Sequence, residues 1–314
     1  MRIITFDQIK KKNISPAECV NWVESALRMK YEVFLPKKTS ISFHDGDVFF
    51  NTMPCLIPQI NRFGVKTVSR YPGRIPSISG EILLYDSNTG SLLALMDADW
   101  ITAMRTGAVA ASTIKHLRKK EAKTYSFIGL GNTTRATLLC LLDIEPNKKY
   151  NIKLLKYKDQ AELFIDRFKH FNTVSFEIVD SIKGLINHSD VIVSGITVTN
   201  DILGKDEWFD EGVLVVPIHT RGFQNCDLFF DKIFADDTAH VMNFKNFEKF
   251  KAFDEFANVL LNKVQGREND KERILAYNIG LALHDVYFAS KILDLEKDER
   301  SEYKLRNPLP KFLI

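Results

Sequence analysis

The 314 residues of the chain are more than one compact core usually needs, so two domains are expected. The 45% hydrophobic and 26% charged content is ordinary for a globular protein, and the net charge of +3 is too small to indicate a nucleic-acid or membrane partner. No apolar run approaches the roughly 20 residues that cross a bilayer, and the first residues show no secretory signal.

The cysteines and histidines indicate neither disulfides nor a bound metal. The four cysteines lie far apart and form no CxxC pair, and the seven histidines show no HExxH or HxH spacing. This pattern argues against a disulfide framework and against a zinc site. We therefore expect a reduced, cytoplasmic protein without a metal.

The first third of the chain predicts one helix, an antiparallel sheet and a second helix. Ser15 and Pro16 are suitable N-cap and N1 residues for an amphipathic helix over 15–32. From residue 39 to 95, apolar and polar positions alternate around turns at 45–46 and 88–90, which is typical of an antiparallel meander. Residues 100–117 predict a helix whose small-residue face, around Gly107 and Ala108, allows the close approach of another backbone or a ligand.

The remainder alternates between strand and helix. Strands are predicted at 124–130, 151–156, 174–179, 190–194, 212–217, 232–235 and 273–277, and helices at 133–142, 158–168 and 280–295. This rhythm is typical of an α/β domain of the Rossmann type, with a doubly wound parallel sheet. The last helix is expected to pack back on the first domain.

A glycine-containing turn follows the first strand of this second half. Gly129 permits a tight turn, and Gly131 lets a pyrophosphate approach the backbone at the positive end of the next helix. Asn132, Thr133 and Thr134 begin that helix and are assigned to the same cofactor site, with Thr134 replacing the third glycine of GxGxxG. A glycine turn without a nucleotide is the alternative, but the strand before and the helix after favour a dinucleotide.

Two lysines lie where the type of dinucleotide is usually decided. The second strand of this half ends at Lys156 and Lys158, where an NAD-binding domain would carry an acid for the adenosine ribose. Basic residues suit a 2′-phosphate, so we expect NADP rather than NAD. Lysines merely solvated at a strand edge are the alternative.

Three segments resemble the ornithine cyclodeaminase and mu-crystallin family. They are residues 64–117, which include TAMRTGAVAA, the turn FIGLGN, and GRENDKERILAYNIGLALHD. The resemblance implies a homodimer whose subunit has a substrate-binding and dimerisation domain at 1–119, completed by a helix at 279–314, and a Rossmann domain at 120–278. Members bind NAD(H) or NADP(H) and transfer hydride between nicotinamide C4 and the α-carbon of an amino acid or imine.

The resemblance also assigns individual residues. Lys66 matches the active-site lysine, which could hold the substrate carboxylate or move a proton at the imine. Arg105 matches the arginine that grips the carboxylate, a task suited to a bidentate guanidinium. Ser77 and Met53 match positions beside the substrate, although Met53 could equally be core packing, and Gly280 is assigned to the cofactor.

One departure from the family concerns its catalytic aspartate. When Asp227 and Leu228 are aligned with the family's acid–leucine pair, Arg221 stands where cyclodeaminases carry that aspartate. A guanidinium cannot activate an amine and then a water molecule, so ornithine cyclodeamination is disfavoured. We expect Arg221 to bind a second acidic group of a larger substrate. His219 is a candidate proton donor, or else a hydrogen-bonded histidine at a strand end.

The other departure is Ser40, which replaces a second carboxylate-binding arginine, with Lys37 and Lys38 just upstream. The sequence favours an NAD(P)-dependent amino-acid dehydrogenase or ketimine reductase whose small-molecule substrate is an amino acid or an imine. A cyclodeaminase-type lyase with bound NAD is one alternative. A non-catalytic, mu-crystallin-like ligand-binding protein is another, and the presence of both Lys66 and Arg105 argues against it.

Overall fold

The computed structural model describes residues 1–44, 47–196, 202–219, 222–223 and 226–296. The chain divides into two compact units. The first unit contains residues 1–14, 29–102 and the segment that starts at 282, and the Rossmann unit contains residues 15–28 and 103–281. This division places residues 103–119 in the Rossmann unit, whereas the functional border was expected after residue 119. The border therefore stays a prediction.

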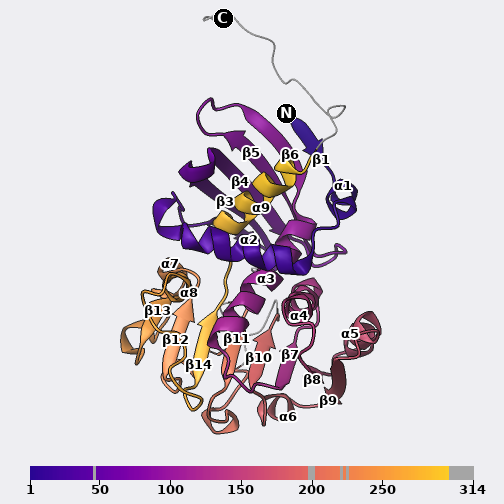
Figure 1. The fold of residues 1–314 in the computed structure, drawn as a ribbon, viewed down its shortest axis with the longest axis vertical. Coiled ribbons are helices and arrows are strands. Elements are labelled where there is room, and N and C mark those ends of the chain that lie inside the picture. Colours follow the sequence, from indigo (N-terminus) through magenta and orange to yellow (C-terminus); the bar gives the residue numbers. More distant parts are fainter. Residues whose placement is uncertain (45–46, 197–201, 220–221, 224–225, 297–314) are drawn as a thin grey trace, which may run out of the picture. The chain divides into compact units, whose positions relative to one another are not determined.

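The first unit is built on a six-stranded sheet of order β1-β6-β5-β4-β3-β2 (Figure 1). Its strands are β1 (Arg2–Ile4), β2 (Thr39–Phe43), β3 (Val48–Ile57), β4 (Arg62–Arg70), β5 (Ile78–Asp86) and β6 (Leu92–Asp97). Strands β2 to β6 form the predicted antiparallel meander. Strand β1, which pairs parallel to β6, was not predicted because three residues show no periodicity. The turn expected at 45–46 lies outside the described residues.

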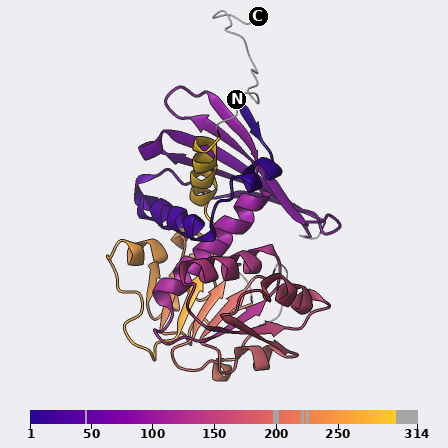
Figure 2. The same ribbon diagram turned by 45° about the vertical axis from the view of Figure 1, so that its right-hand side comes forward.

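Short helices and one long helix complete this unit. Helix α1 (Phe6–Lys11) starts at Thr5 with a capping box, and η1 (Lys30–Glu32) and η2 (Pro58–Ile60) are single turns. Helix α9 (Ala282–Asp294) lies across β3, β4 and β5, as both ribbon views show (Figures 1 and 2). Gly64 on β4 permits this contact, because a Cβ there would lie 2.7 Å from Val286 Cγ2. The predicted packing of the last helix on the N-terminal sheet is thus seen for its described part.

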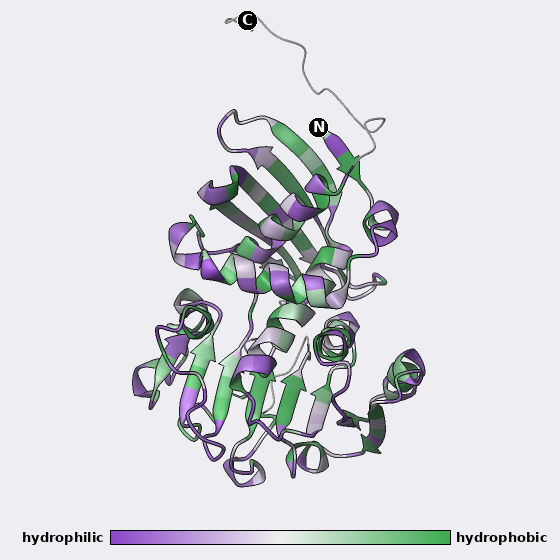
Figure 3. Cartoon of the chain, in the orientation of Figure 1, coloured by the Kyte–Doolittle hydropathy of each residue, from purple (hydrophilic) through white to green (hydrophobic). Residues whose placement is uncertain are grey.

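The Rossmann unit has an eight-stranded sheet of order β13-β12-β14-β11-β10-β7-β8-β9, and every pairing in it is parallel. Its strands are β7 (Thr124–Ile128), β8 (Tyr150–Leu155), β9 (Val174–Val179), β10 (Val191–Ser194), β11 (Leu214–Pro217), β12 (Lys232–Ala235), β13 (Phe253–Glu255) and β14 (Ile274–Tyr277). Strands β10, β11 and β14 are buried throughout and apolar in Figure 3, as a parallel sheet covered on both faces requires. The predicted fold class is confirmed.

The helices of this unit are α2 (Pro16–Arg28), α3 (Asp99–Leu117), α4 (Asn132–Ile144), α5 (Gln160–Phe168), α6 (Ile182–Ile186), α7 (Thr238–Val241) and α8 (Phe256–Leu260), with single turns η3 (Asp206–Trp208) and η4 (Phe247–Lys249). Helix α3 begins in the first unit and continues in this one. Helix α5 starts later than predicted, because Lys158 has a left-handed φ of 52°. Helices α6, α7 and α8 were not predicted, since five residues or fewer show too little periodicity.

The small-residue face of α3 serves a helix contact. A Cβ on Gly107 would lie 2.5 Å from the carbonyl carbon of Ala136 and 2.6 Å from the nitrogen of Thr137, both on α4. Of the two alternatives left open by the sequence, Gly107 therefore admits another backbone.

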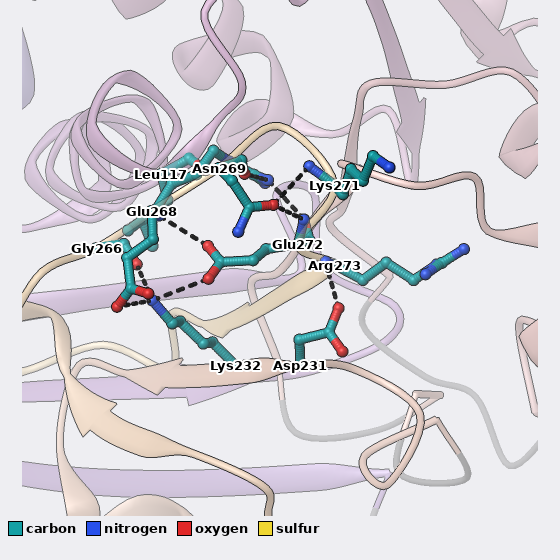
Figure 4. A network of polar contacts seen from close by, with 10 residues as sticks. Leu117, Asp231, Lys232, Gly266, Glu268, Asn269, Lys271, Glu272 and Arg273 are labelled. Carbon is teal, nitrogen blue, oxygen red and sulfur yellow. Dashed lines mark hydrogen bonds and ion pairs between the residues drawn. The ribbon is translucent and has the colours of Figure 1, made fainter.

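A polar network joins the far end of α3 to the segment before β14 (Figure 4). Arg267 Nε donates to the carbonyl of Leu117, the last residue of α3, at 2.7 Å. Lys232 Nζ lies 2.9 Å from Glu268 and 3.2 Å from Glu272. These contacts fix α3 relative to β14, and the other ends of those two elements lead to Arg105 and Gly280. None of the helices in the described ranges is long and apolar enough to cross a membrane.

Candidate functional site

The glycine turn lies at the crossover point of the parallel sheet. Strand β7 is flanked by β10 on one side and β8 on the other, so the connections diverge at its end. In doubly wound sheets, ligands bind beyond the carboxyl ends of the strands at this point. The turn predicted from the sequence therefore occupies the position that a dinucleotide site requires.

Gly129 and Gly131 have different structural reasons to be glycine. Gly129 has a left-handed φ of 77°, and a Cβ there would lie 2.6 Å from the carbonyl carbon of Gly195, which follows β10. Gly131 has an ordinary φ of −81°, and its Cβ would meet no atom of the described residues within 4 Å. Open space in front of Gly131 fits a ligand that approaches the backbone closely.

The N-terminus of α4 is suited to an anion. Gly131 is its N-cap, and no side chain of the described ranges caps the helix there. The first-turn amides of a 13-residue helix and its positive dipole end then point at the space beside Gly131. Asn132 and Thr133 are the first residues of this turn. The residues present thus fit the pyrophosphate of a dinucleotide.

Thr134 explains how the third glycine can be missing. Its hydroxyl donates to the carbonyls of Gly129 at 2.9 Å and Gly131 at 3.0 Å, and its side chain is fully buried. A Cβ on Gly195 would lie 2.7 Å from Thr134 Cγ2. Gly195, at the end of the neighbouring strand β10, therefore leaves the space that the Thr134 side chain needs. Thr134 in turn holds the glycine turn through its two hydrogen bonds.

The two lysines expected to select the cofactor follow β8 directly. Lys156 Nζ lies 3.9 Å from Asp180 Oδ1, with both side chains largely exposed, which makes a weak ion pair. Lys158 Nζ lies 5.4 Å from the ring centre of Tyr157. Both therefore lie at the carboxyl end of the strand next to β7.

Lys66 forms a buried ion pair with the last helix. Its Nζ lies 2.9 Å from Asp285 Oδ1, and both side chains are completely buried. Lys66 is opposite Met53 on β3 and Ile82 on β5, both of them core residues. Burial, and secondarily the Asp285 carboxylate, raises the pKa of the nearby Cys55 to about 12, so that thiol stays neutral. The predicted lysine is thus buried and paired with a carboxylate, next to apolar cross-strand neighbours.

The other residues of the first unit that the sequence singled out are Ser77, Met53 and Ser40, and they differ in burial and in contacts. Ser77 lies in the β4–β5 connection and accepts hydrogen bonds at its carbonyl from Tyr71 and Arg74. Met53 is buried core packing and also the cross-strand neighbour of Lys66, and its place beside the substrate stays a prediction. Ser40 is exposed on the outermost strand β2.

Arg105 is buried on α3 and lies against Gly280. A Cβ on Gly280 would lie 2.6 Å from Arg105 Nη1, and Gly280 has a left-handed φ of 104°. The amide of Gly280 donates to the buried carboxylate of Asp236, which also lies 3.1 Å from His240 Nδ1. Gly280 was assigned to the cofactor, and its structural contact is with the guanidinium of Arg105. Its role toward the cofactor stays a prediction.

His219 lies just beyond β11, and its Nε2 is 2.6 Å from the hydroxyl of the buried Ser194 at the end of β10. This contact matches the alternative of a hydrogen-bonded histidine at a strand end, and it also places the imidazole at the carboxyl edge of the sheet. Arg221 lies outside the described residues. Asp227 is fully buried and accepts a hydrogen bond from the Tyr277 hydroxyl at 2.7 Å. Burial raises the pKa of Asp227 to about 6, and the Tyr277 hydrogen bond only partly opposes this.

The structure thus brings predicted residues into contact in three places, two in the Rossmann unit and one in the first unit. In the Rossmann unit the glycine turn, Thr134 and the end of β10 meet, and Arg105 meets Gly280. In the first unit Lys66 meets Asp285 and Met53. Gly195, Asp285 and Asp236 were not predicted as site residues. Asp285 stands in a segment that carried the family resemblance, but only the fold reveals its partner.

Comparison with known proteins shows which family the chain is similar to. The family model for "Ornithine cyclodeaminase/mu-crystallin family" matches residues 2–300. The nodulation efficiency protein NfeD of Rhizobium meliloti is 27% identical over 295 residues, covering 90% of this chain and 91% of that protein. An alanine dehydrogenase of Archaeoglobus fulgidus is 26% identical over 327 residues, covering 96% and 98% respectively.

Among solved structures, the fold resembles that of the Thermococcus litoralis Δ1-pyrroline-2-carboxylate reductase in complex with NADH and L-proline. The two superpose with a TM-score of 0.82 at 25% identity, covering 94% of this chain and 97% of the other. With the family model matching nearly its entire length, the chain belongs to the ornithine cyclodeaminase/mu-crystallin family.

Proposed function

We propose that the protein is an NAD(P)-dependent oxidoreductase that interconverts an α-amino acid and the corresponding imine. The observation that carries this proposal is the α4 N-terminus at the crossover of the parallel sheet, where the described part of the chain provides no capping side chain and leaves open space at Gly131. The similar alanine dehydrogenase and pyrroline-2-carboxylate reductase support an amino-acid or imine substrate.

When bound, the nicotinamide cofactor supplies or accepts a hydride at the substrate α-carbon. Arg105 binds the substrate carboxylate through its planar guanidinium, which Gly280 leaves room to lie flat. Lys66 donates one proton from Nζ to the imine nitrogen, so that the carbon–nitrogen double bond becomes an amine. Lys66 then regains a proton from water. Replacing Arg105 with Ala tests its role, because unchanged KM and kcat for the imine would contradict it.

We further propose a preference for NADPH. Lys156 and Lys158 supply positive charge at the end of β8, and the weak pair with Asp180 leaves Lys156 mostly exposed. The double variant Lys156→Glu/Lys158→Glu tests this: the KM for NADPH should rise about tenfold or more while that for NADH stays the same or falls. An equal change for both cofactors would show that the lysines are merely solvated.

The remaining assignments stay proposals of the same kind. Arg221 is proposed to bind a second acidic group of the substrate and His219 to donate a proton. Ser77 is proposed to lie beside the substrate. A cytoplasmic location is proposed as well, because the four cysteines are buried and lie far apart in the sequence, which suits a reducing compartment.

We also propose a homodimer formed through the outer face of the six-stranded sheet. Ile41 and Phe50 are cross-strand neighbours on this face, and with Phe43 they form an exposed apolar patch at the β2 edge. Such a patch favours association. The double variant Ile41→Lys/Phe50→Lys should sediment as a monomer if this face is the interface, and an unchanged dimer would contradict it.

The reaction is tested by a panel of imines and amino acids with NADH and NADPH. A reductase consumes reduced cofactor in equal amounts with the imine, and its absorbance falls. A cyclodeaminase-type lyase instead releases ammonia with no net change in cofactor absorbance. A protein that binds cofactor but turns over no substrate on the panel would be a ligand-binding member of the family, and the proposal would be wrong.

A further inference from the structure

A buried carboxylate on the last helix faces the lysine of the proposed reaction. We propose that Asp285 is a positioning residue that holds the Lys66 ammonium in its working orientation, an inference that rests on the proposed function. It makes α9, more than 200 residues beyond Lys66 in the chain, a part of the catalytic apparatus.

The sequence of α9 and of β4 creates this contact. Gly64 lets the helix approach the sheet closely, because a Cβ there would lie 2.7 Å from Val286 Cγ2 on the helix. Lys66, two residues later on the same face of β4, then places its Nζ 2.9 Å from Asp285 Oδ1. Asp285 belongs to the first turn of α9, where the helix dipole favours a carboxylate. The negative charge is therefore held in place by two independent features, the helix end and the ammonium.

Stability alone does not explain a buried pair of this kind. Desolvation of two charges roughly cancels their attraction, and apolar residues of similar volume usually stabilise a core equally well. The surrounding positions Met53, Cys55 and Ile82 are apolar, as a purely structural face would be throughout. A second pair between β4 and α9, Arg62 with Asp294 at 3.6 Å, shows the ordinary partly exposed arrangement.

The chemistry explains why such a lysine needs a partner. A lysine side chain has four rotatable carbons, so its ammonium is poorly directed without a fixed acceptor. Asp285 takes no part in bond making: one proton leaves Lys66 for the imine nitrogen and one returns from water.

The test compares Asp285→Asn with Asp294→Asn, the same substitution on the exposed end of the same helix. Loss of orientation by about 1 Å can lower a rate by about 10²-fold, so kcat/KM for the imine should fall by about that factor in Asp285→Asn. Its pH dependence should shift, and the KM for reduced cofactor should stay unchanged. Asp294→Asn should match the wild type in all three measurements.

A double-variant cycle separates positioning from structure. If Asp285 acts through Lys66, adding Asp285→Asn to Lys66→Met should lower kcat/KM by less than twofold beyond Lys66→Met alone. Full additivity of the two losses would overturn the proposal. If Asp285→Asn does not fold, Asp285→Glu keeps the charge and moves it by one methylene. Wild-type kinetics in a folded Asp285→Glu would also overturn the proposal.

Failure of the proposed reaction looks different from failure of this inference. A wild-type protein that turns over no imine refutes both the reaction and the role of Asp285 in it. An active wild type whose kcat/KM and pH profile survive Asp285→Asn refutes the positioning role alone. An active wild type with a selective, non-additive loss in Asp285→Asn supports both.

Discussion

Gly280→Ala should impair the binding of a substrate carboxylate without touching the substrate itself. The new Cβ would lie 2.6 Å from Arg105 Nη1, 3.3 Å from Nη2 and 3.4 Å from Cζ. The guanidinium therefore has to retreat by roughly 1 Å to reach an ordinary contact distance. Because Arg105 is buried on a helix whose end is fixed to the β14 segment, it cannot simply swing into water.

The size of the effect follows from this displacement. A misplacement of about 1 Å can cost up to about 10²-fold in rate, so we expect kcat/KM for the imine to fall by about 10- to 100-fold. That range corresponds to about 1.4–2.8 kcal/mol of transition-state stabilisation. The left-handed φ of 104° adds a separate cost to folding, of about 1–3 kcal/mol for a residue with a side chain.

The control is Gly90→Ala, in the β5–β6 turn. Gly90 also has a left-handed φ, of 69°, but a Cβ there would meet nothing within 4 Å. It reproduces backbone strain without a displaced side chain. Steady-state kinetics at varied imine and cofactor, with a thermal melt of each variant, separate the two effects. If Gly280→Ala shows a lower Tm but the kinetics of Gly90→Ala, Gly280 only relieves strain and the argument for Arg105 is refuted.

Three further changes have expected outcomes. Gly131→Val should leave the Tm of the cofactor-free protein within a few degrees, since its Cβ position is open, but raise the Kd for reduced cofactor about 10-fold or more; equal affinities by calorimetry would contradict this. Burial raises the pKa of Asp227 to about 6, above its unfolded value, so the free energy of unfolding of the wild type should fall by about 3 kcal/mol as pH rises from about 4 to 6. In Asp227→Asn, urea unfolding should no longer show this dependence of stability on pH. Burial disfavours the charged form of Glu24. The hydrogen bond from His116, the charge of Lys115 and the hydrogen bond from Ser112 outweigh this burial and lower the pKa of Glu24 to about 2. The stabilisation of the fold by ionised Glu24, up to about 3 kcal/mol, is present above about pH 4.5 and lost as pH falls toward 2. A midpoint of acid unfolding that Glu24→Gln leaves unchanged would refute this stabilisation.

The local patterns of the sequence predicted the fold class because the strands and longer helices carry their own periodicity. Alternation over 39–95 predicted the antiparallel strands β2 to β6, and the strand–helix rhythm of the second half predicted a parallel sheet. Boundaries failed where a single backbone angle decides them: Lys158 at φ 52° prevents α5 from starting there. Helices of five residues or fewer contain too little pattern to be detected.

By itself, the sequence determined where the glycine turn lies, because a strand, Gly129-Leu130-Gly131 and a helix follow one another directly. It also determined, through resemblance, that Lys66 and Arg105 are the candidate substrate residues. Only the tertiary structure decided what supports them. Gly195 compensates for Thr134 from the neighbouring strand, Gly280 makes room for the Arg105 guanidinium, and Asp285 meets Lys66 from a helix 219 residues away. These contacts join segments distant in the chain, and no local pattern encodes a distance between two such segments.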